Sequence, residues 1–185
     1  MKQTLKVKNG SNNLAVTNSS DKPVYVNLVR KGIPLISDNS GAEKGLTMKI
    51  EYLNTSLQPV DRKNLLQGTD FMMVTRVTNN TYSRLDNIAL TEMVPSGWEI
   101  QNTRLFEANY GIRESTFDYR DFRDDRVNAY FSLNQGETKV FVLILNAAYN
   151  GEFYQPSVWC EAMYTGNCYS RIPGNRVNVT GQKIE

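Results

Sequence analysis

The chain has 185 residues, of which 40% are hydrophobic and 22% charged, a profile typical of one ordinary domain with a sizeable buried core. It contains no histidine and only two cysteines, which excludes Ser-His-Asp and Cys-His catalysis, His-bearing zinc sites and a four-cysteine metal cage. The balance of 21 basic and 19 acidic residues gives no case for nucleic-acid binding, and the longest apolar run, Val140 to Leu145, is far shorter than the roughly 20 residues that cross a bilayer.

The first 36 residues read as a short set of strands ahead of a domain boundary. Alternation of apolar and polar residues predicts strands at Thr4 to Lys8, Asn13 to Thr17 and Pro23 to Arg30, with Asn9-Gly10 as a turn between the first two. Because the chain begins inside the first of these strands, we expect it to be a piece of a longer protein. The polar stretch that follows predicts a linker over residues 37–45.

Residues 46–185 read as a separate all-β domain. Its predicted strands are Leu46 to Leu53, Asp70 to Asn79, Asn87 to Val94, Val127 to Leu133, Val140 to Leu145, Phe153 to Met163, Cys168 to Ile172 and Arg176 to Thr180. Short strands separated by turns must stack one apolar face on another, so we predict an antiparallel β-sandwich of the immunoglobulin/fibronectin type. The segment Val140 to Leu145 is apolar on both faces, which favours the centre of a sheet.

The segment from Asp118 to Arg126 is the most highly charged part of the chain. Clustered carboxylates suit a calcium ion or an acid/base pair, but calcium loops have a central glycine, and here interleaved arginines compete for the same carboxylates. We therefore predict a structural hydrogen-bond network that fixes a loop before the Val127 strand, and no metal site. Its members are Asp121, Arg123, Asp124, Asp125 and Arg126.

Two further features carry alternative interpretations. A hairpin folded about Tyr164 would set Cys160 and Cys168 opposite each other, so either a disulfide, which implies an oxidising compartment, or two reduced buried thiols are expected. Trp98 ends the turn Pro95-Ser96-Gly97-Trp98, and we predict that it caps one end of the sandwich; stacking of a sugar on an exposed Trp98 is the alternative.

Several motifs jointly resemble the C-terminal end of bacterial alpha-2-macroglobulins. The resemblance covers about residues 46 to 180 and identifies an MG10-type macroglobulin-like domain, with residues 1–36 resembling the last strands of a preceding CUB-like domain. The motifs that carry it are Leu66-Gln67-Gly68-Thr69-Asp70, Pro95-Ser96-Gly97-Trp98-Glu99-Ile100, Tyr119-Arg120-Asp121 to Asp124-Asp125-Arg126-Val127, Tyr130-Phe131, Ala147-Ala148-Tyr149-Asn150-Gly151, Glu161-Ala162-Met163-Tyr164 and Arg171-Ile172-Pro173-Gly174.

The resemblance implies a part in a large envelope-associated protease trap. In such proteins a protease cuts a bait segment, and in members with a thioester an activated Cys–Gln bond captures the attacker. Neither cysteine here lies in a Cys-x-Glu-Gln setting, so a thioester would belong to another domain, and Met163 and Tyr164 match the Met-Tyr pair of the loop that shields it. The cysteine pair beside that loop is not a feature of the family, and some members lack the thioester.

We therefore predict a non-enzymatic shielding module without cofactor, metal or nucleic-acid partner. The implied partners are other domains of its own parent chain and, through the parent, target proteases. The implied location is the periplasm or cell envelope, with the parent anchored as a lipoprotein. The alternative is a cell-surface immunoglobulin-like adhesion or carbohydrate-binding module, for which a sandwich with exposed aromatic residues would suffice.

Overall fold

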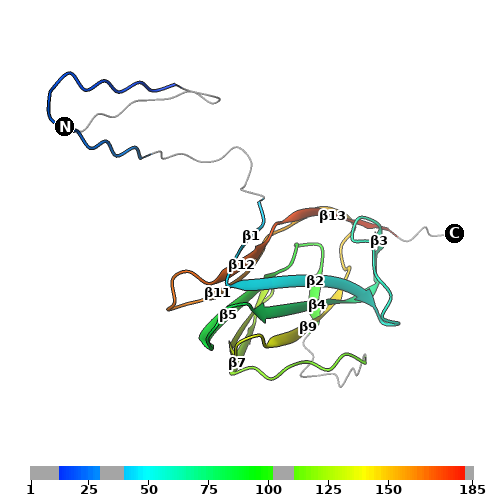
Figure 1. The fold of residues 1–185 in the computed structure, drawn as a ribbon. Coiled ribbons are helices and arrows are strands. Elements are labelled where there is room, and N and C mark those ends of the chain that lie inside the picture. Colours follow the sequence, from blue (N-terminus) through cyan, green and yellow to red (C-terminus); the bar gives the residue numbers. More distant parts are fainter. Residues whose placement is uncertain (1–12, 30–39, 102–110, 182–185) are drawn as a thin grey trace. The chain divides into compact units, whose positions relative to one another are not determined.

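A computed structural model describes residues 13–29, 40–101 and 111–181 of the chain (Figure 1). The chain divides into two compact units, Met1–Leu35 and Ile36–Glu185. In the described ranges all regular elements are strands, and no helix has the length and apolarity to cross a membrane.

The described part of the first unit contains two extended segments joined by a turn. Asn18 closes the turn, because its Nδ2 donates to Lys22 O at 2.8 Å and its Oδ1 accepts from Ser20 N at 3.1 Å. The strands predicted at Asn13 to Thr17 and Pro23 to Arg30 are wrong for residues 13–29, which form no β-ladder there. Their alternating apolar side chains lie exposed. Alternation alone does not make a stable strand, because a strand also needs a partner backbone and a covering layer. The strand predicted at Thr4 to Lys8 lies outside the described residues.

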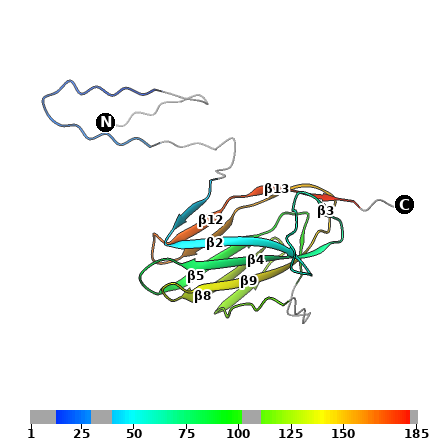
Figure 2. The same ribbon diagram turned by 45° about the vertical axis from the view of Figure 1, so that its right-hand side comes forward.

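The second unit is a β-sandwich, and the prediction of an all-β antiparallel sandwich is confirmed (Figures 1 and 2). One sheet has the order β1-β12-β11-β5-β8-β7, the other β2-β4-β9-β6, and a small third sheet has the order β10-β13-β3. Every pairing is antiparallel except β13 with β3. The strands are β1 (Ala42–Lys44), β2 (Leu46–Asn54), β3 (Leu65–Leu66), β4 (Asp70–Asn79), β5 (Leu85–Met93), β6 (Glu99–Gln101), β7 (Tyr119–Phe122), β8 (Arg126–Leu133), β9 (Thr138–Asn146), β10 (Gly151–Gln155), β11 (Val158–Ala162), β12 (Tyr169–Ile172) and β13 (Asn175–Thr180).

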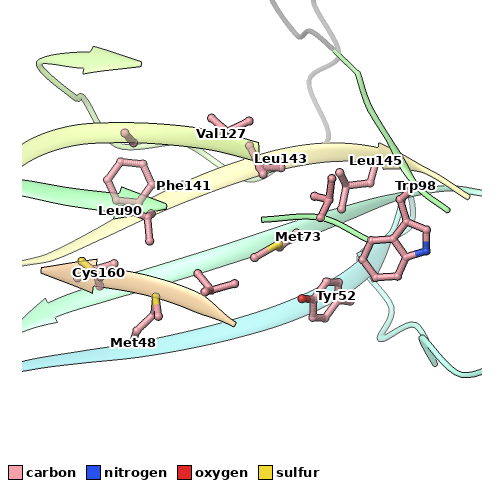
Figure 3. Close-up of a cluster of buried hydrophobic side chains, with 14 of the residues drawn as sticks. Met48, Tyr52, Met73, Leu90, Trp98, Val127, Phe141, Leu143, Leu145 and Cys160 are labelled. Carbon is pink, nitrogen blue, oxygen red and sulfur yellow. The ribbon is translucent and has the colours of Figure 1, made fainter. Parts of the chain in front are cut away.

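The core lies between the six-stranded and the four-stranded sheet. Phe131 of β8 meets Phe141 of β9 across this gap, with ring centroids 4.6 Å apart, and both are fully buried. Figure 3 shows Met73, Leu90, Leu143 and other side chains of both sheets directed into the same layer. Strand β9 lies between β4 and β6, as its continuous apolar sequence predicted.

Three sequence assignments are corrected by the structure. The single strand predicted from Phe153 to Met163 is two strands in different sheets, because Pro156 lacks the amide donor that would continue the ladder. The predicted linker 37–45 includes strand β1, which pairs with β12. The charged segment predicted to be a loop contains β7, which pairs with β8 from Tyr119 to Phe122.

Candidate functional site at the β11–β12 turn

The predicted shielding pair, Met163 and Tyr164, lies at the tip of the hairpin formed by β11 and β12. The chain turns over residues 163–168, where Thr165 N donates to Ala162 O at 3.3 Å and Gly166 takes a positive φ of 51°. The Tyr164 side chain is 81% exposed and that of Met163 41%. An aromatic ring and a thioether therefore project from this end of the sandwich.

The turn is anchored on β5. Met163 N donates to Asn87 O at 3.1 Å, at a position where the β5–β8 register shifts between Leu85 and Ile88. Asn87 has a positive φ of 55°, a conformation that asparagine tolerates better than most residues. This irregularity turns the Asn87 carbonyl toward the tip and fixes the backbone of Met163.

Gly45 provides the second anchor of the turn. It has a φ of +71°, and a Cβ placed on it would lie 2.9 Å from Cys168 Sγ and 3.0 Å from Thr81 Cγ2, so a side chain there would be strained and would require these neighbours to shift. Beside it, Lys44 Nζ donates to Asn167 Oδ1 at 3.0 Å. Backbone and side-chain contacts from two segments, β5 and residues 44–45, thus anchor the turn.

The two cysteines are free thiols, and the predicted opposition of their sulfurs is wrong. Strand register pairs Cys160 with Ser170, and Ala162 N donates to Cys168 O at 2.9 Å, so each cysteine lies opposite a different residue. The five-residue turn at 163–167 sets this register, whereas the prediction had assumed a hairpin centred on Tyr164. Burial, with a smaller contribution from Glu92, raises the pKa of the Cys160 thiol, which leaves it a small hydrophobic side chain.

The charged segment forms the β7–β8 turn and two separate exposed ion pairs. Arg123 Nε donates to Asp121 Oδ2 at 2.8 Å, and Arg126 forms two bonds with Asp125 at 2.9 and 2.6 Å. Asp124 lies at the turn itself. Asp125 O also accepts from Val94 N at 3.0 Å, which ties this turn to the end of β5. In residues 13–29, 40–101 and 111–181, no cluster of three or more His, Cys, Asp or Glu side chains could hold a metal ion.

Trp98 is 3% exposed and lies in the core, near Tyr52 and Leu145 (Figure 3). Its ring makes edge contacts with Phe71, at a centroid distance of 4.9 Å, and with Tyr52, at 6.0 Å. A ring this deeply buried offers no face on which a sugar could stack, so the sugar-stacking alternative for Trp98 is excluded.

Sequence reasoning missed a buried carboxylate, Glu92. It occupies an inward-facing position of β5 and accepts a 2.6 Å hydrogen bond on Oε1 from Thr75 Oγ1 of the facing sheet, while Oε2 is buried without a partner. Burial raises the pKa of Glu92 to about 7, against smaller lowering effects of Thr75 and Arg120 and a raising effect of Glu114. The available signal was a charged residue in phase with Ile88 and Leu90 in the strand alternation.

Asn79, at the end of β4, is a second buried polar residue that sequence reasoning missed. Its Nδ2 donates to Ser83 O at 2.8 Å and to Asn134 O at 3.1 Å, and its Oδ1 accepts from Thr81 N at 2.9 Å. One amide group therefore joins the β4–β5 turn to the β8–β9 turn, at the same end of the sandwich as Tyr164.

The fold is shared with solved alpha-2-macroglobulins. Trypsin-activated alpha-2-macroglobulin from Escherichia coli superposes with a TM-score of 0.69 at 18% identity, over 76% of this chain and 11% of that one. Salmonella alpha-2-macroglobulin reacted with methylamine superposes with a TM-score of 0.70 at 21% identity, over 80% of this chain and 10% of that one. The sandwich is thus of the class found in macroglobulin domains.

The family profile described as bacterial alpha-2-macroglobulin MG10 domain matches residues 45–167. The chain belongs to this family, which confirms the resemblance seen in its motifs, and it is a structural module of the alpha-2-macroglobulin type. It is 23% identical over 168 residues to the alpha-2-macroglobulin of Rickettsia conorii and 26% identical over 157 residues to that of Xylella fastidiosa. These matches cover 88% and 78% of the chain, which spans 9% of the length of each relative.

Proposed function

We propose that this chain is the C-terminal shielding module of a larger bacterial protease trap, and that its β11–β12 turn covers a thioester in another domain of that parent protein. The observation that carries the proposal is the exposed Met163-Tyr164 pair on a turn anchored by Asn87 and Gly45. Large apolar side chains that are exposed on a rigid turn favour contact with a partner surface.

The chemistry of a thioester calls for such a cover. Water or an amine attacks its carbonyl carbon, a C–O or C–N bond forms, the C–S bond breaks, and the sulfur leaves as a thiol after taking up a proton. The bulk of an aromatic ring and a thioether would exclude water from this carbon. Among the similar solved structures are an alpha-2-macroglobulin reacted with methylamine and others activated by trypsin or by porcine elastase, which supports an amine-sensitive, protease-triggered parent.

The rest of the proposed function follows from the family. The module has no catalytic role and needs no cofactor; its partners are the other domains of the parent and, through the parent, target proteases. The proposed location is the periplasm or cell envelope, with the parent anchored as a lipoprotein. We also propose that residues 1–36 complete a preceding CUB-like domain, which would cover the exposed apolar residues of 13–29. Membership in the family favours this function over an adhesion or carbohydrate-binding module.

The test is the rate at which the parent protein incorporates methylamine before any protease is added. Tyr164→Ala should raise this rate and the matching rate of thiol release, because the cover loses its ring. Tyr149→Ala is the matched control, since Tyr149 is 55% exposed in the β9–β10 turn at the other end of the sandwich. An unchanged rate for Tyr164→Ala, or no methylamine incorporation by the unaltered parent, would refute the shielding function.

A further inference from the structure

The end of the sandwich that carries Tyr164 presents a second exposed aromatic residue, Tyr82. Its side chain is 94% exposed, and it belongs to the turn between β4 and β5. Figures 1 and 2 both show this green turn beside the orange β11–β12 turn. No interpretation of the sequence had singled out Tyr82.

The two turns share one anchor. Thr81, next to Tyr82, and Cys168, which ends the β11–β12 turn, both pack against Gly45, within 3.0 Å of where its Cβ would lie. Asn80 N also donates to Gly45 O at 2.9 Å. A displacement of either turn would therefore shift the other turn through their shared contacts with Gly45.

The backbone on both sides of Tyr82 is held by hydrogen bonds. Its neighbours on both sides bond to the buried Asn79 amide: Thr81 N donates to Oδ1 at 2.9 Å, and Ser83 O accepts from Nδ2 at 2.8 Å. Thr81 Oγ1 adds a 2.7 Å bond to the same Oδ1. The ring of Tyr82 thus projects from an ordered turn, so a partner would meet it at little cost in conformational entropy.

The tips of both turns, residues 80–83 and 163–167, carry no charged residue, and Arg84 ends the β4–β5 turn. Residues 80–83 are Asn, Thr, Tyr and Ser, and residues 163–167 are Met, Tyr, Thr, Gly and Asn. Charged residues flank these tips, among them Lys44 at the base and the Arg84–Asp86 ion pair, 2.7 Å long, after Ser83. The β7–β8 turn differs, since all three of its residues, Arg123, Asp124 and Asp125, are charged. An uncharged centre with tyrosine and methionine inside a charged rim is the composition of a protein–protein interface.

We infer that the β4–β5 turn and the β11–β12 turn form one docking surface for the thioester-bearing domain of the same parent protein, with Tyr82 as a second anchor beside Tyr164. This inference rests on the proposed function for the identity of the occupant. Two aromatic anchors on one rigid base fix the orientation of the cover as well as its contact, whereas a single tip leaves the docked domain free to pivot about it.

Two measurements on the full-length parent protein test the inference. In the first, Tyr82→Ala raises the rate of methylamine incorporation roughly five- to thirtyfold, as expected when an anchor residue of an interface is truncated. Tyr82→Phe, which keeps the ring, leaves the rate close to that of the unaltered protein, as does the control Tyr149→Ala. Because Tyr82 is exposed in this chain, the variants should unfold at the same temperature as the unaltered 185-residue chain.

In the second measurement, the photo-crosslinking residue benzoylphenylalanine is placed at position 82, 164 or, as control, 149, and the crosslinked peptides are identified by mass spectrometry. Crosslinks from positions 82 and 164 to one domain support the docking surface. If position 164 reaches the thioester-bearing domain and position 82 reaches none, the inference is overturned and the shielding function stands. If positions 82 and 164 reach one domain but Tyr164→Ala leaves methylamine incorporation unchanged, the shielding function fails and the two-turn surface stands.

Discussion

Replacement of Glu92 by glutamine should make the sandwich more stable at neutral and alkaline pH. Glu92 is completely buried between the two sheets, and its pKa is raised from an ordinary value of 4.5 to about 7, first by burial. The charged groups that act on it are Arg120 of β7, 4% exposed, and Glu114 of the preceding segment, which is bonded to Arg120 at 2.7 Å. Glu92→Gln keeps an acceptor for Thr75 Oγ1 and removes the charge.

The free energy of unfolding falls with rising pH because the unfolded chain loses the Glu92 proton at a lower pH than the folded chain does. Below pH 4.5 both the folded and the unfolded chain carry it, and the contribution of Glu92 to stability is fully present. Between pH 4.5 and about 7 the unfolded chain releases the proton first, so the free energy of unfolding falls as the pH rises. A shift of this size corresponds to about 3 kcal/mol, lost in full above pH 8.

The assay is urea denaturation of the 185-residue chain and its Glu92→Gln variant at pH 5, 6, 7 and 8. We expect the free energy of unfolding of the variant to rise relative to that of the unaltered chain with each step in pH, by up to about 3 kcal/mol at pH 8. Glu152→Gln is the control, because Glu152 is exposed on β10 and its replacement should give a difference that does not depend on pH. A constant difference for Glu92→Gln over this range would refute the reasoning, as would a variant less stable than the unaltered chain at pH 8.

Two further predictions concern the base of the turn. Gly45→Ala should lower the free energy of unfolding by about 1–3 kcal/mol, because alanine must take a positive φ and press on Cys168 and Thr81. The control is Gly136→Ala, where φ is also positive but nothing lies within 4 Å of the added Cβ. Equal losses of stability for the two variants in urea denaturation would contradict a role for the contacts at Gly45. In the native chain, iodoacetamide should label Cys168, which is half-buried, before Cys160, which is buried with a raised pKa. Mass spectrometry would show the order, and a Cys160-first reaction or a Cys160–Cys168 bridge would contradict the structure.

Local sequence pattern was sufficient to place the long strands β4 and β9 of the four-stranded sheet. The alternation from Asp70 to Asn79 predicted β4 with its bounds, and the continuous apolar run at Val140 predicted the central strand β9. Both signals are local because a side chain in a strand faces the core or the opposite side by its own position in the pleat. The motifs of the chain were equally sufficient to indicate the MG10 family.

Register and partnership were decided only by the tertiary structure. The segment Phe153 to Met163 was predicted as one strand, yet its halves belong to different sheets, and residues 23–29 alternate without forming any ladder. The positions of Cys160 and Cys168 depend on the number of residues in the intervening turn, and a shift of pairing changes every cross-strand neighbour. The proximity of Tyr82 to the Tyr164 turn depends on Gly45, which joins two segments far apart in the sequence. Composition and periodicity therefore determined which strands this chain can form, and the contacts between sheets and turns determined which of its side chains meet.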